Sequence, residues 1–402
     1  CEGCLAQSCL PFSRRWRTRP SSELRHGKGL EERARDLPAH SVSQPHARFG
    51  VFTFPAVLLI LIFSVFPLIA SLVISFTRVR PRAGGYNMRF VGFRNFKKIF
   101  FGSEQYHLLG TFEAISALGW CLILVMLSAL LWWLYSYTKK DFKLIGFIGR
   151  VISAAFIFSV TILFSVTLFS GNNFGTLPMT IIYVIFGCSI QFLIGLGLAY
   201  ICSMNLKGRT FFRILFFMPL MITPVGIAYQ WRMLADMNRG PLSGIWQSFG
   251  FGDLAWGSLA WPARTIIMIA DAWMWIPFIF IVLVAALDTV SKDLVEAADV
   301  DGAGKWLIFK DVIWPQIAPV AGTVVLIRWI EGFKLVDIPL VMTSGGPGIS
   351  TETLTMHSWT QWRALDFGGS SAVAYTLLFV TVIICVSFFN FVIRKYSQAN
   401  QL

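Results

Sequence analysis

Four charged residues recur at three-residue spacing in one segment of the chain: Arg328, Glu331, Lys334 and Asp337. Side chains three positions apart are neighbours on a helix, so opposite charges at this spacing can pair. Apolar residues precede them and resume afterwards, so that the whole segment covers residues 317–342. Because charge inside a membrane-length segment usually faces a bundle interior, we predict structural ion pairs on a span whose second half faces protein or water.

A lone carboxylate, Asp271, lies in the apolar segment 266–287 beside Trp273 and Trp275. An intramembrane carboxylate needs a partner, which is either a neighbouring helix or a transported molecule. Aromatic rings that stack on C–H faces, and polar groups that bond hydroxyls, can also bind a small polar molecule. Asp271, Trp273, Trp275 and Tyr229 are therefore candidates for a substrate path, although Trp and Tyr also serve as interface anchors.

The residue pattern does not support nucleotide, metal or enzymatic chemistry. The phosphate-cradling pattern GxxxxGK[ST] is absent, since the GK pairs at Gly27 and Gly304 lack its spacing. No metal-ligand cluster can be read among the five His residues, and a CxxC at Cys1 and Cys4 offers too few ligands for zinc. We predict a protein that is not an enzyme and that binds no metal or cofactor itself.

The polar stretch 290–319 between two apolar segments has an unusual pattern for a linker. Gly302 and Gly304 permit a tight corner, and Pro315 begins the next apolar segment, where a missing N–H costs little. The small or apolar residues that fall at helical spacing before this corner are Leu294, Ala297 and Ala298. The pattern predicts a short helix–turn–helix whose alanine surface can dock into a groove of another protein. The alternative is an ordinary amphipathic helix.

The composition places these motifs in a membrane. Of 402 residues, 55% are hydrophobic and only 14% are charged, against about 25% charged in soluble proteins. A bilayer core of about 30 Å needs roughly 20 apolar residues in a helix. The candidate spans are residues 49–76, 115–135, 151–169, 179–202, 211–229, 266–287, 317–342 and 372–393. They predict an all-α polytopic bundle of about eight spans.

Basic residues determine the predicted orientation, because Lys and Arg collect in cytoplasmic loops. Residues 1–48 carry nine of them, and the stretch 290–319 carries Lys292, Lys305 and Lys310, so both termini are predicted to be cytoplasmic. Residues 77–113 hold seven basic residues on the predicted outer side, and part of this loop, 90–101, is predicted to be an interfacial helix. The net charge of +13 is thereby assigned to the membrane surface rather than to nucleic acid.

The stretch 290–319 resembles the EAA loop of permease subunits in ATP-binding-cassette (ABC) importers. Glu296, Ala297, Ala298, Gly302 and Pro315 match the family spacing, and Asp301 to Ala303 resemble its carbohydrate-uptake branch, the maltose/glycerol-phosphate type. Further similar stretches are residues 90–96, 208–225, 271–280 and 329–348. The resemblance covers about residues 50–100 and 178–396.

This resemblance implies a permease for a sugar or a related polyol or sugar phosphate, in a bacterial or archaeal plasma (inner) membrane. The implied partners are a second permease, cytoplasmic ATPase subunits that bind ATP and Mg²⁺, an extracytoplasmic solute-binding protein and membrane lipid, without nucleic acid. In the family, the EAA loop seats in a cleft of the ATPase. The residues then expected to couple to it are Glu296, Ala297, Ala298, Asp301, Gly302, Ala303 and Pro315. The alternatives are an ion-coupled secondary transporter and a membrane scaffold without transport.

The predicted organisation is a six-span permease core with an extra hairpin. Because the chain begins with Cys, we expect its first residues to mark a fragment boundary or a misassigned start. The predicted regions are a basic, disordered tail (1–48), the first core span with its outer loop (49–104), an inserted transmembrane hairpin (105–175), the core (176–396) and a C-terminal tail (397–402).

Overall fold

A computed structural model describes residues 46–390, apart from 83, 112–114, 140–143, 169–173, 205–207, 237–238, 242 and 251–255. The predicted tail 397–402, and residues 1–45 of the predicted tail 1–48, lie outside the described residues. The chain divides into two units, Cys1–Val65 and Phe66–Leu402. The described part of the first unit is helical, with α2 (His46–Ile60) followed by the π-helix η1 (Leu61–Val65).

The second unit begins with one helix and a β-hairpin. Helix α3 (Phe66–Ser75) leads into strands β1 (Thr77–Arg82) and β2 (Gly85–Phe90), which pair antiparallel with Thr77 opposite Phe90. The predicted interfacial helix at 90–101 is shorter than expected, because only α4 (Arg94–Phe101) is helical. Residues 77–80 alternate buried and exposed side chains, a period of two that favours a strand.

The remaining helices build the bundle and its two ends. They are α5 (Gln105–Leu109), α6 (Ala117–Thr138), α7 (Leu144–Leu168), α8 (Thr176–Ile182), η2 (Tyr183–Gly187), α9 (Cys188–Ser203), α10 (Arg209–Phe217), η3 (Met218–Met221), α11 (Pro224–Leu234), α12 (Ser243–Ser248), α13 (Ala260–Asp288), α14 (Lys292–Val300), α15 (Lys305–Leu307), η4 (Ile308–Ile313), α16 (Trp314–Phe333), α17 (Asp337–Thr343), α18 (Leu354–Arg363) and α19 (Phe367–Phe388).

Among the described residues, seven helices are long and apolar enough to cross a membrane, or eight if a bent pair counts as one span. This confirms the predicted polytopic helical fold. The bent pair is the expected span 211–229, which was predicted as one helix. It breaks between Met221 and Pro224, and the two parts differ by 98°. Proline lacks the N–H that would continue the helix, which explains the break.

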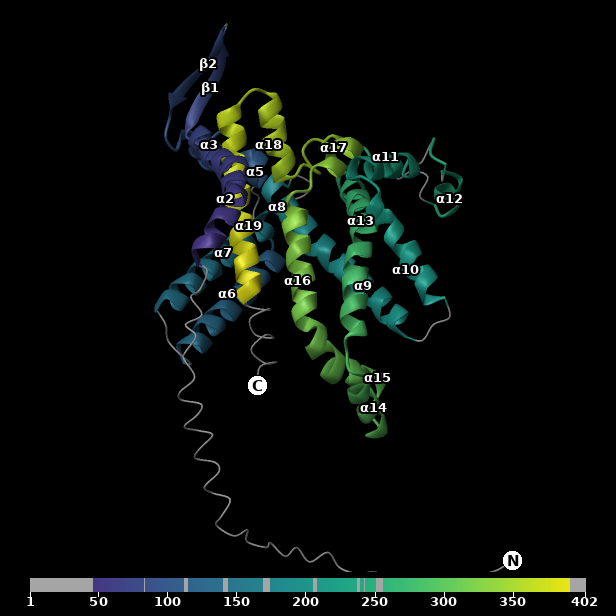
Figure 1. The fold of residues 1–402 in the computed structure, drawn as a ribbon. Coiled ribbons are helices and arrows are strands. Elements are labelled where there is room, and N and C mark those ends of the chain that lie inside the picture. The colour runs from purple at the N-terminus through teal and green to yellow at the C-terminus, as the bar shows by residue number, and fades with distance from the viewer. Residues whose placement is uncertain are drawn as a thin grey trace, which may run out of the picture. The chain divides into compact units, whose positions relative to one another are not determined.

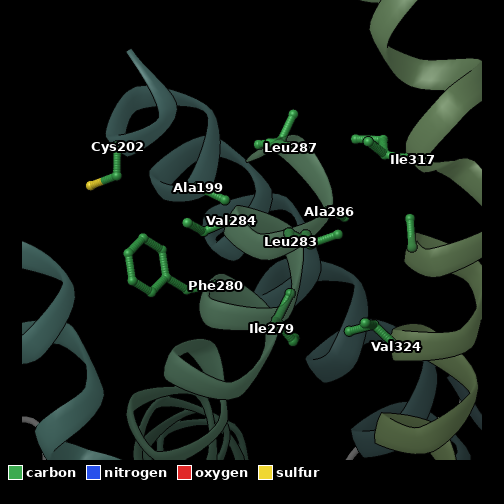
Figure 2. Packing of buried hydrophobic residues seen from close by; sticks show 11 residues of the cluster. Ala199, Cys202, Ile279, Phe280, Leu283, Val284, Ala286, Leu287, Ile317 and Val324 are labelled. Carbon is green, nitrogen blue, oxygen red and sulfur yellow. The ribbon is translucent and has the colours of Figure 1, made fainter. Parts of the chain in front are cut away.

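Helices α9, α13 and α16 share one apolar core, drawn in Figure 2. Ala199 from α9, Phe280 and Leu283 from α13, and Val324 from α16 are all buried there. Gly195 on α9 lets the two backbones approach, since a Cβ at this position would lie 2.7 Å from Ile279 Cγ2. Small residues at the interface are the usual way for membrane helices to pack closely.

The two ends of the second unit carry different elements, as Figure 1 shows. One end holds α14 and α15, between the spans α13 and α16. The opposite end holds α5, α11, α17 and α18.

A partly buried carboxylate at this opposite end, Glu104, connects three segments. Lys98 Nζ lies 2.7 Å from Glu104 Oε1, which also accepts a hydrogen bond from Gln361 Nε2 at 3.0 Å. Burial raises the pKa of Glu104, but these two bonds outweigh burial and lower it.

Candidate functional sites

The loop 290–319 forms the helix–turn–helix that its pattern predicts. Helix α14 ends in two hydrogen bonds typical of a Schellman motif: Ala303 N–H donates to the Ala298 carbonyl and Gly302 N–H to the Asp299 carbonyl, both at 3.0 Å. Gly302 has a φ of +79°, a left-handed conformation that only glycine adopts without strain. The sequence thus places its glycine at the one position of this turn that requires it.

The surface of this loop is exposed. None of the residues of α14 is buried, and Glu296 and Ala297 are both exposed. Val300 is 87% exposed and Trp306 73%. Solvent-exposed large apolar side chains close together at the end of a helix pair are typical of a protein interface.

The second half of the loop is continuous with a span. Helix α15, the π-helix η4 and α16 follow one another without a gap, and Pro315 lies in the first turn of α16. A π-helical turn before a proline is expected, because Pro315 cannot donate the backbone bond that a regular helix needs there. The loop is therefore an extension of α16 on one side and is joined to α13 by a short turn on the other.

A buried polar cluster links the three helices that share the apolar core. Arg328 on α16 donates from Nη2 to Asp271 on α13, and from Nε to Gln191 Oε1 on α9 at 2.7 Å. Gln191 Nε2 donates to the same Asp271 oxygen at 2.7 Å. The guanidinium carbon of Arg328 lies 4.8 Å from the centre of the Trp275 ring. Asp271 Oδ2 thus has its partners within the chain, and Trp275 lies against one of them, whereas Asp271 Oδ1 is buried with no hydrogen-bond partner among the described residues.

The charged series at three-residue spacing does not form one ladder. Lys334 Nζ and Glu331 Oε1 pair at 2.6 Å, the predicted i,i+3 arrangement, whereas Arg328 pairs with Asp271 on another helix. Asp337 begins the separate helix α17. The prediction of a single span through residue 342 is wrong, because α16 ends at Phe333. An acidic residue in the first turn of a helix is favourable, which explains Asp337 at the new start.

The other substrate-path candidates lie near the bent span. Tyr229 on α11 is 56% exposed, and Trp273 meets Trp231 edge to face at 6.4 Å between ring centres. Arg232 Nη1 on α11 donates to the Val341 carbonyl of α17 at 2.8 Å. Tyr229 and Trp273 as substrate contacts stay predictions.

Two features were missed in the sequence. Gln191 is a partner in the buried cluster, and no local pattern singles it out. His107, Glu352 and His357 come together in space, with one ligand atom from each within 4.8 Å of the others, although the sequence predicted no metal-ligand set. Glu352 lies 245 residues from His107 along the chain, so spacing rules for short motifs cannot find the pair.

Comparison with known proteins supports the resemblance seen in the loop. Residues 191–395 match the family of binding-protein-dependent transport system inner membrane components. The trehalose/maltose transport system permease protein MalF of Thermococcus litoralis is 30% identical over 205 residues, which are 51% of this chain and 69% of that protein. The sn-glycerol-3-phosphate transport system permease protein UgpA of Escherichia coli O157:H7 is 28% identical over 208 residues, 50% of this chain and 69% of that protein.

The fold is also similar to that of a solved structure. A chain of a bacterial ABC transporter involved in the import of the acidic polysaccharide alginate aligns with a TM-score of 0.57 and 16% identity. The alignment covers 91% of this chain and 99% of that one. The membrane-length helices and the family match over residues 191–395 define a transport permease. The chain belongs to the family of binding-protein-dependent transport system inner membrane components.

Proposed function

We propose that this chain is a permease subunit of an ABC importer for a sugar or a related polyol or sugar phosphate. MalF and UgpA, which it resembles, are permeases of a trehalose/maltose system and of an sn-glycerol-3-phosphate system. A second permease completes the translocation path, and an extracytoplasmic binding protein delivers the substrate. ATP hydrolysis takes place in separate cytoplasmic subunits, to which the loop 290–319 couples.

The observation that carries this proposal is the exposed helix–turn–helix between two spans that a buried ion pair joins. A partner that moves α14 acts directly on α13 and on α16, because the loop connects them. Since Arg328 and Asp271 hold these spans together, a displacement at the loop reaches both spans as one body. This is the arrangement that coupling to an external motor requires.

The orientation follows from the same proposal. The end with α14 and α15 faces the cytoplasm, where the ATPase subunits lie, together with both termini. The opposite end, with α5, α11 and α18, faces the binding protein. The loop's three lysines, Lys292, Lys305 and Lys310, then lie on the cytoplasmic side, where Lys and Arg collect.

A charge reversal in the loop tests the coupling. Glu296 is exposed, so Glu296→Lys should leave folding and membrane insertion intact but abolish uptake of labelled sugars by cells that depend on this chain. Lys139→Glu, a reversal at another exposed residue in the turn after α6 and outside the loop, is the control and should transport normally. Wild-type uptake by Glu296→Lys would contradict the proposed docking role.

The energy source distinguishes the main alternative. Uptake that is blocked by vanadate and persists when ionophores collapse ion gradients fits an ABC importer. Uptake that resists vanadate and stops with an ionophore would identify an ion-coupled carrier instead.

A further inference from the structure

We propose that His107, Glu352 and His357 form a binding site for a divalent transition-metal ion, with Zn²⁺ as its probe, at the end of the bundle opposite the loop 290–319, which we call the coupling loop. The three residues come from α5, from the turn before α18 and from α18 itself. An ion bound there would fasten the short outer helix α5 to α18. This proposal does not depend on the transported substrate.

The geometry is that of two imidazoles converging on one carboxylate. His107 Nε2 lies 2.7 Å from Glu352 Oε2, and His357 Nδ1 lies 3.2 Å from Glu352 Oε1. Ligands bound to zinc at about 2.0–2.1 Å in a tetrahedron lie roughly 3.3 Å apart. The observed spacings therefore need only small shifts to admit an ion. Two His and one carboxylate leave a fourth position for water or another group.

Burial makes the site more than a surface cluster. The side chains of Glu352 and His357 are 7% and 2% exposed, whereas His107 is 32% exposed and so leaves an entry path. A carboxylate oxygen and imidazole nitrogens are ligands that Zn²⁺ takes in proteins.

An unsatisfied atom points to a missing partner. His357 Nε2 is buried and has no hydrogen-bond partner among the described residues, although buried polar atoms normally have one. An ion that took Nε2 of His357 as its ligand atom, in place of Nδ1, would supply such a partner. Thr360 Oγ1 lies 3.4 Å from Glu352 Oε1, in the place of an outer-shell group that orients a ligating carboxylate.

The experiment is a Zn²⁺ titration of the purified full chain in detergent. Cys1, Cys4 and Cys9 are first replaced by Ser, because terminal thiols could bind zinc independently. We expect one Zn²⁺ per chain after chelation and reloading, and a rise in Tm with zinc, because an ion that binds only the folded state stabilises it. Co²⁺ in place of Zn²⁺ should give visible absorption of a low-symmetry site.

Variants separate a metal site from a simple hydrogen-bonded cluster. Glu352→Gln and His107→Gln should each weaken zinc binding by about 100-fold or more, and Thr360→Val by about tenfold. Glu331→Gln, a carboxylate paired with Lys334, should bind zinc like the parent chain. His107→Gln is the more exposed change and is the one least expected to affect folding.

Three results would overturn the proposal. The first is a parent chain without zinc-dependent stabilisation or a Co²⁺ signal. The second is zinc binding that is unchanged in His107→Gln and Glu352→Gln. The third is a Tm that falls in Glu352→Gln without zinc while zinc has no effect on the parent, which would show a hydrogen-bonded clamp alone.

Discussion

Replacing Gly302 by Ala is expected to weaken docking of the ATPase to the coupling loop without affecting the rest of the fold. A Cβ at Gly302 would meet nothing within 4 Å, so the change causes no clash. Its cost comes from the backbone alone, because the Schellman turn requires φ of +79° at this residue. An L-residue in the left-handed region costs about 1–2 kcal/mol.

This cost sets the size of the effect. An energy of about 1–2 kcal/mol changes an equilibrium by a factor of about 5–30. If docking requires the turn, the apparent affinity for the ATPase should fall by that factor, as should the ATPase activity that depends on assembly. Gly302→Asn should retain much more of both, because Asn visits the left-handed region more readily.

The assay compares membranes that carry each variant with the same partner subunits. ATPase retained on the affinity-tagged permease is measured at several ATPase concentrations, followed by substrate-stimulated hydrolysis. The control is Gly304→Ser, two residues away, where φ is −66° at the N-cap of α15 and Ser is a preferred residue. If Gly302→Ala binds like the wild type, or if Gly304→Ser loses as much, the turn is not what the ATPase recognises.

Three further sets of changes test the helix packing and the ion pairs. Gly195→Ala should lower stability by about 1–3 kcal/mol through overpacking against α13, measured as a fall in Tm in detergent. Gly197→Ala is the control, because its added Cβ has no atom within 4 Å; equal effects of the two changes would refute this contact. Asp271→Leu or Arg328→Met alone should cost about 3–5 kcal/mol, and the double variant much less, because no unpaired charge remains buried; additive losses in a double-mutant cycle would refute the pairing. Glu104→Gln should lower Tm at neutral pH, and the difference from the wild type should shrink as pH falls below the ordinary pKa of 4.5, since a lowered folded-state pKa gives stability that acid removes; a difference independent of pH would contradict it.

The coupling loop could be predicted because everything that defines it is local. The two bonds that close its turn span three and five residues, and the residue that requires a left-handed backbone, Gly302, is the glycine that the sequence pattern contains. The spans could be predicted for a similar reason, since length and apolar composition are properties of single segments. Neither prediction needs to know which helices are neighbours.

The partner of Arg328 could not be predicted from spacing. Glu331 is three positions away, but the observed partner, Asp271, is 57 residues away on another helix. A local rule favours the near charge, whereas burial favours the pair that shares a dry interior. The start of the separate helix α17 could be predicted in part, because an acidic residue and a proline in a first turn, here Asp337 and Pro339, favour the beginning of a helix.

The buried cluster of Arg328, Asp271 and Gln191 holds three helices together at the cost of desolvating two charged groups. Apolar residues of similar volume often stabilise a protein as well as a buried ion pair does or better, and the neighbouring apolar core already packs α9, α13 and α16. What the charged cluster adds is a fixed register, because Arg328 can satisfy both partners only at one relative position of the helices. The proposed function gives this register a purpose, because spans that an ATPase moves must not slide past one another. Under that proposal the loop 290–319 receives the displacement, and the buried cluster keeps α13 and α16 together while it is transmitted.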